Sequence, residues 1–68
     1  MSNIYKLTEV VGTSPVSFAE AAKAAIAHAS KTVRHMEWFE VVSERGHIDG
    51  DKITEFQVTV KIGFRIEQ

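Results

Sequence analysis

The segment from residue 55 to residue 66 alternates almost without interruption between polar and apolar side chains. The even positions are apolar: Phe56, Val58, Val60, Ile62, Phe64 and Ile66. The odd positions are mainly polar: Glu55, Gln57, Thr59, Lys61, Gly63 and Arg65. A period of two is typical of a β-strand with one buried face and one polar face. We therefore predict a strand from about Ile53 to Ile66 whose apolar face forms the core.

Two further segments have strand character. Residues 3–11 are rich in Ile, Tyr, Leu and Val with polar residues between them, and we expect residues 12–15 to end this first strand. Residues 37–48 predict a second strand, in which Phe39 and Val41 share one face and Trp38 lies on the other. Asp49-Gly50 is a strong hairpin signal, so this strand should pair with the last one.

A helix is predicted between the first two strands. Ser17 and Glu20 have the spacing of a capping box, while Ser14 followed by Pro15 offers a competing start. One apolar stripe follows helical spacing through Phe18, Ala22, Ala25, Ala29, Val33 and Met36. Because alanine makes up half of this stripe, the helix can approach a sheet closely.

These elements predict an α+β fold of order β-α-β-β, with a three-stranded antiparallel sheet and one helix on its apolar face. Residues 1–68 form a single domain in this interpretation. The other sheet face is left open, and if Phe39 is in the core, Trp38 lies on that open face. An exposed tryptophan of this kind indicates an interface or a ligand groove.

The size of the chain predicts an oligomer. A domain of 68 residues buries only about 60% of its unfolded surface and is marginally stable alone. Cysteine is absent, so neither disulfides nor a thiolate zinc site can supplement the core. Association with further copies is the remaining source of stability.

Charge and hydropathy argue against two classes of partner, nucleic acids and membranes. The net charge is -1 with scattered Lys and Arg, which argues against nucleic-acid binding. The apolar runs are too short to span a membrane, and the N-terminus does not have the pattern of a secretion signal. Together with the lack of cysteine, this favours a cytoplasmic protein.

Four side chains are candidates for ligand binding, each with a simpler structural alternative. Trp38 either belongs to the core, closes an interface, or stacks on a flat ligand. Gln57 is either an idle surface residue or pairs with the edge of a heterocycle through its amide. Arg45 and His47, close together near the hairpin, are either solvated or bind phosphate, for which arginine has a suitable fork of donors.

Catalysis and metal binding find little support in the sequence. Ser14, Ser17 and Ser30 occupy cap or helix positions, and nothing pairs them with a histidine. His28 and His35 are seven residues apart, about 10.5 Å along a helix, which is too far for one metal ion. We predict that the protein is not an enzyme and holds no metal ion within one chain.

The chain resembles the dodecin family, in particular its bacterial branch, over its whole length. The resemblance rests on residues 11–14 before an alanine-rich helix, residues 38–41, residues 45–47, residues 56–58 and residues 60–64. It implies a sheet wrapped around one helix, a hollow homododecamer, and flavin bound as stacked pairs between symmetry-related Trp38 rings. Gln57 would then meet the pyrimidine edge of the flavin.

The same resemblance implies further ligand contacts. Arg45, near the ribityl phosphate, would favour FMN over riboflavin or FAD. Some relatives also hold coenzyme A near the three-fold axes, where Lys6 and Arg65 are the candidate residues. The leading hypothesis is a flavin storage protein that quenches photoexcited flavin. The alternatives are a self-assembling structural module without flavin, a coenzyme A-binding assembly, and a small flavoenzyme.

Overall fold

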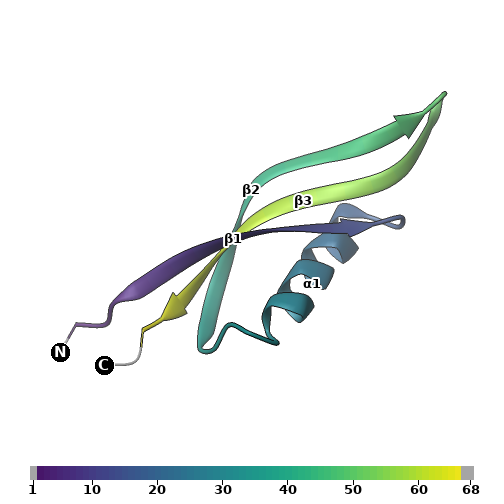
Figure 1. Cartoon of the computed structure of the whole chain (residues 1–68). Helices are drawn as coiled ribbons and strands as arrows, with labels where there is room; N and C mark the ends of the chain where they lie inside the picture. Colours follow the sequence, from purple (N-terminus) through teal and green to yellow (C-terminus); the bar gives the residue numbers. More distant parts are fainter. Residues whose placement is uncertain (1, 67–68) are drawn as a thin grey trace.

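The computed structural model describes residues 2–66 and has the predicted order of elements. Strand β1 spans Tyr5–Ser14, helix α1 spans Phe18–Ala29, strand β2 spans Met36–Asp49 and strand β3 spans Lys52–Arg65. The sheet order is β1-β3-β2 and both pairings are antiparallel. The α+β, β-α-β-β fold predicted from the sequence is confirmed (Figure 1).

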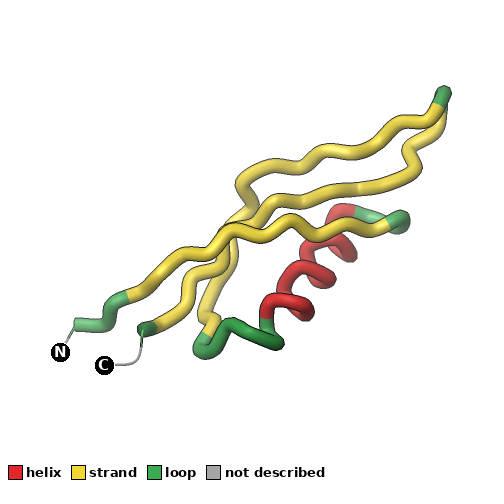
Figure 2. The backbone as a smooth tube through the Cα atoms, viewed as in Figure 1, coloured by secondary structure: helices red, strands yellow, loops and turns green. Residues whose placement is uncertain are grey.

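The helix covers one face of the sheet and leaves the other uncovered (Figure 2). It packs against β1 and β3, while the β2–β3 hairpin extends well beyond it. The protomer is consequently long and thin, with extents of 54 × 20 × 13 Å. We call the uncovered side the helix-free face; on β3 it carries Gln57, Thr59, Lys61 and Gly63.

The core is small and lies between α1 and β3. Its buried apolar residues are Ala21, Ala25, Ala29, Val58, Val60 and Ile62. The predicted core face of the last strand is therefore confirmed at its centre, whereas Phe56 and Phe64 are only partly buried. Three alanines on the helix allow it to lie close to the sheet, and six buried residues are few for a stable domain.

The predicted end of the first strand was wrong. Residues 12–14 were expected to break the strand, but they continue β1 and pair with residues 56–58 of β3. Gly12 faces α1 from within the strand. A Cβ at this position would meet the Ala25 Cβ at 2.8 Å and overlap the Ala21 carbonyl oxygen. The glycine thus permits the close approach of α1, and the strand ends immediately before Pro15, which lacks a backbone N–H for further pairing.

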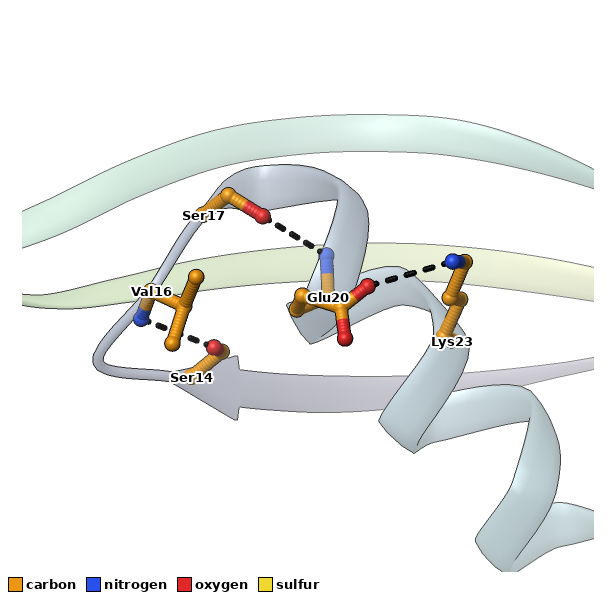
Figure 3. A network of polar contacts seen from close by, with 5 residues as sticks. All are labelled: Ser14, Val16, Ser17, Glu20 and Lys23. Atoms are coloured by element: carbon orange, nitrogen blue, oxygen red, sulfur yellow. Dashed lines mark hydrogen bonds and ion pairs between the residues drawn. The ribbon is translucent and has the colours of Figure 1, made fainter.

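The helix begins at the predicted cap. The Ser17 hydroxyl accepts a hydrogen bond of 3.0 Å from the Glu20 amide, as Figure 3 shows. The Glu20 carboxylate instead forms an ion pair of 3.2 Å with Lys23, on the next helical turn. Ser14, the competing start, is the last residue of β1 and accepts a bond of 2.9 Å from the Val16 amide in the turn that follows.

The helix is shorter than the apolar stripe predicted. It ends at Ala29, followed by a turn in which the Val33 amide donates to the Ala29 carbonyl at 2.8 Å. Val33 therefore lies in the connecting loop and Met36 begins β2, although both still pack against the core. Within residues 2–66, no helix is long and apolar enough to cross a membrane.

The β2–β3 hairpin turns at the predicted position, and Gly50 has a φ of 65°, which glycine adopts without strain. Its pairing is irregular in three places, between Met36 and Trp38, between Val41 and Ser43, and between His47 and Ile48. At each of these places one strand has an extra residue that the register pairs with no residue of the other strand. The extra residues are Glu37 and Val42 on β2, and Thr54 on β3. These are β-bulges, which increase the local twist of the sheet.

Candidate ligand-binding face

Trp38 lies on the helix-free face, as expected from its neighbour Phe39. It pairs in register with Gly63 of β3, and the benzene part of its indole lies directly over that glycine. The ring of Tyr5, from β1, meets the indole edge-on at a centroid distance of 5.1 Å and an interplanar angle of 68°. Trp38 remains 43% exposed in the protomer. A flat aromatic surface is therefore held on the sheet and remains accessible.

Gln57 is half-buried near the other end of the same face and belongs to a chain of three side chains. Arg45 Nε donates to Gln57 Oε1 at 2.9 Å, and Gln57 Nε2 donates to Glu55 Oε1 at 2.8 Å. The charged partners on either side fix which end of the amide carries oxygen and which carries nitrogen. A guanidinium has five N–H donors, so this bond leaves Arg45 with further donors for a phosphate.

His47 lies beside this chain, opposite Glu55 in the register. Its Nδ1 is 3.1 Å from the Thr54 hydroxyl, which also donates to the His47 carbonyl oxygen at 3.3 Å. The imidazole is thereby held at the bulge near the hairpin tip. Arg45 and His47 thus lie on one stretch of β2, two residues apart.

Lys6 and Arg65 lie apart from the other candidates, at the end of the sheet where β1 begins and β3 ends, in neighbouring register positions. They line a cavity of about 330 Å³ together with Thr32, Val33, Arg34, His35, Phe64 and Ile66. Arg65 also lies 3.9 Å from the Glu37 carboxylate. Three of the lining residues, Lys6, Arg34 and Arg65, are basic, and basic residues suit an anionic ligand.

Trp38 and Gln57 do not meet within one protomer. Trp38 lies over Gly63, six residues along β3 from Gln57. At about 3.4 Å per residue, this separation is roughly 20 Å, longer than the ring system of a flavin. One flavin ring can contact a Trp38 and a Gln57 together only if the two residues belong to different copies of the chain.

Sequence reasoning missed several residues that shape this face. Tyr5 and Gly63 hold the indole, and Glu55 orients the amide of Gln57. The alternation of residues 55–66 places Glu55 and Gly63 on the same face as Gln57, so this signal was present. Their partners depend on the positions of the bulges, which the sequence pattern does not give.

The described residues show one further cavity of note. It measures about 580 Å³ and is lined by Ala19, Ala22, Lys23, Ile26, Ala27 and Phe39. Phe39 thus faces the helix, as the alternation predicted, but it is 49% exposed in the protomer. Residues 2–66 contain no group of three or more His, Asp or Glu residues that could hold a metal ion.

Comparison with known proteins identifies the family. A family model described as Dodecin matches residues 4–67. Dodecin from Thermus thermophilus is 46% identical over 68 residues, covering 100% of this chain and 99% of the relative. The structure of dodecin from Streptomyces davaonensis is similar with a TM-score of 0.94 at 40% identity, and all of both chains is covered.

Dodecin from Streptomyces coelicolor gives a TM-score of 0.92 at 44% identity, covering 97% of this chain and 94% of the relative. The similarity therefore extends over both sequence and fold, and over nearly the whole of each chain. The resemblance drawn from the sequence motifs is confirmed. This chain belongs to the dodecin family.

Proposed function

We propose that the protein is a non-enzymatic flavin store. It assembles as a homododecamer and holds FMN, or the related riboflavin and FAD, as stacked pairs between Trp38 rings of different protomers. Membership of the dodecin family supports this proposal, and so does the geometry of the helix-free face. The expected cytoplasmic location and the single domain over residues 1–68, whose ends lie outside the described residues, stay predictions.

The observation that carries the proposal is the presentation of the Trp38 indole. Its ring is packed against Gly63, it makes a T-shaped contact with Tyr5, and it is 43% exposed. Such a ring already has a fixed orientation, so a planar ligand that stacks on it does not have to immobilise a mobile side chain. Stacking between aromatic rings is worth about 0.5–1.5 kcal/mol beyond area burial.

The polar chain near the hairpin supplies complementary chemistry. The Gln57 amide has both a donor and an acceptor, which match the alternating N–H and C=O groups of a pyrimidine edge. Arg45 supplies donors for the ribityl phosphate, which favours FMN among the flavins. Because Trp38 and Gln57 are about 20 Å apart in one protomer, the complete site requires at least two copies of the chain.

The residues of the helix-free face support flavin storage rather than enzymatic turnover. An indole in contact with an excited isoalloxazine is a good electron donor, so stacking is expected to return the flavin to its ground state. Light-driven damage would then be limited while the flavin is held. Among the described residues on this face, the side chains are arranged to hold a ring and a phosphate rather than to transfer a proton to a second substrate.

A fluorescence titration of FMN with ligand-stripped protein tests the proposal. We expect flavin emission to be quenched and to saturate near one flavin per protomer. Trp38→Ala should lose most of the affinity while light scattering still reports the wild-type oligomer. Quenching by Trp38→Ala as strong as by the wild type would contradict stacking as the main source of affinity.

A structural module without flavin is the second candidate, because several large apolar side chains near the hairpin are exposed. Val41, Val42, Ile48 and Ile53 are each at least 49% exposed in the protomer. If Trp38 only seals a subunit contact, Trp38→Ala will dissociate the oligomer and the wild type will not bind FMN. A coenzyme A-binding assembly is the third candidate, supported by the basic cavity that Lys6 and Arg65 share.

A further inference from the structure

Gly63 occupies an unusual position for a glycine. It lies within β3, the central strand of the sheet, where a residue without a side chain weakens the strand. It is nevertheless buried, although Arg65, two residues later on β3, is exposed. The cover comes from the Trp38 indole of β2, which lies directly opposite in the register.

The geometry shows how the indole lies. A Cβ built on Gly63 would overlap three atoms of the benzene ring at once, Cζ2, Cε2 and Cη2. A Cβ in a strand projects away from the plane of the sheet, so a ring that covers this position lies across the strand rather than standing beside it. Any side chain at position 63 would lift the indole off the backbone.

Tyr5 fixes the indole from a second direction. It comes from β1, on the far side of β3, and reaches across the strand to meet the indole edge-on at 5.1 Å. An edge-to-face arrangement of this kind is a favourable aromatic contact. The indole is thus positioned by the backbone of β3, which it covers, and by its T-shaped contact with a ring of β1.

We propose that Gly63 is a positioning residue of the ligand site, acting through Trp38. By lacking a side chain it sets the height and tilt of the indole, so that the outer face of the ring is presented parallel to the sheet. This presentation selects planar fused-ring ligands, because only a flat molecule can contact the whole of such a surface. The inference rests on the proposed function as a flavin store and adds the residue that determines its stacking geometry.

Gly63→Ala in the full-length, ligand-stripped protein tests this inference. FMN affinity, measured by fluorescence titration, should fall about tenfold, since the added methyl group displaces the stacking surface. The near-UV circular dichroism of the single tryptophan should change, because its environment is altered. Lys61→Ala, two residues away on the same face, is the matched control and should leave both signals unchanged.

A double-mutant cycle with Trp38→Ala shows whether Gly63 acts through the indole. In the wild-type background, Gly63→Ala should lower the unfolding temperature. In the Trp38→Ala background the overlap is gone, so the same change should leave the unfolding temperature unchanged or raise it by restricting the unfolded chain. An equal loss in both backgrounds, or unchanged affinity and circular dichroism for Gly63→Ala, would overturn the inference.

The titration, the circular dichroism and the double-mutant cycle distinguish failure of the proposed function from failure of this inference. If the wild type binds no FMN, the proposed function is wrong, and the circular dichroism and the cycle still decide whether Gly63 positions Trp38. If Gly63→Ala does not assemble, the double variant should recover the oligomer because the added methyl group no longer meets a ring. If Trp38→Ala alone assembles and the double variant does not, the inference is overturned.

Discussion

At the scale of single residues, the helix-free face is organised by pairs across strands. Arg45 is paired with Gln57, and Trp38 with Gly63. The residue types of Trp38, Gln57 and Arg45 indicated a heterocycle site from the sequence alone. Their partners could not be predicted, because a regular hairpin turning at Gly50 would place Arg45 opposite Phe56. The extra residue Thr54 shifts the pairing by one and brings Gln57 opposite Arg45.

Gln57→Ala tests the polar half of the site. We expect FMN affinity to fall by about 1–3 kcal/mol, because the polar edge of the bound ring loses its partner in a desolvated site. The measurement is a fluorescence titration beside the wild type, with Thr59→Ala, on the same face of β3, as the control. An affinity equal to that of the wild type would remove Gln57 from the site.

At the scale of elements, the sequence predicted type and order better than boundaries. The capping box correctly located the start of α1, because Ser17 can satisfy an orphan amide of the first turn. The apolar stripe overestimated its length, because Val33 and Met36 reach the same core from the loop and from β2. Gly12 was taken for a strand breaker, although its role is to admit the helix. Local patterns identify apolar positions but not the backbone path between them.

Ser17→Ala tests the cap of the helix. Losing the bond to the Glu20 amide should cost about 0.5–2 kcal/mol of stability, which thermal unfolding at one fixed protein concentration would record as a lower unfolding temperature. The control is Ser30→Ala at the other end of the helix, where the hydroxyl donates to the Ala27 carbonyl at 2.7 Å. An unfolding temperature of Ser17→Ala equal to that of the wild type would show that the cap is not what stabilises the start of α1.

At the scale of the whole molecule, the protomer does not enclose its own core. Its radius of gyration is 14.1 Å, whereas a compact domain of this length would have about 11 Å. The apolar cavity of about 580 Å³ beside α1 is open to solvent, and Phe39 in its wall is half exposed. Both features favour association of several copies, which the length of the chain predicted.

Size-exclusion chromatography with light scattering tests this association. We expect a single species of twelve chains at micromolar concentration, and an unfolding temperature that rises with protein concentration. Phe39→Glu should lower the mass of the species, because a charge would be buried at a contact between copies. A wild-type protein that elutes as a monomer would contradict the assembly and, with it, any site shared between protomers.

The bulges of the hairpin have a consequence for the shape of the proposed assembly. The register of β2 and β3 skips three residues, Glu37, Val42 and Thr54. Each of them could therefore be deleted without changing any register pair of the two strands. What such a deletion would change is the twist that the bulge imposes. The hairpin would then leave the protomer at a different angle, and copies joined through it would enclose a different curvature. In the proposed assembly these three residues would therefore adjust the curvature and leave the register pairs of Trp38 with Gly63 and of Arg45 with Gln57 intact.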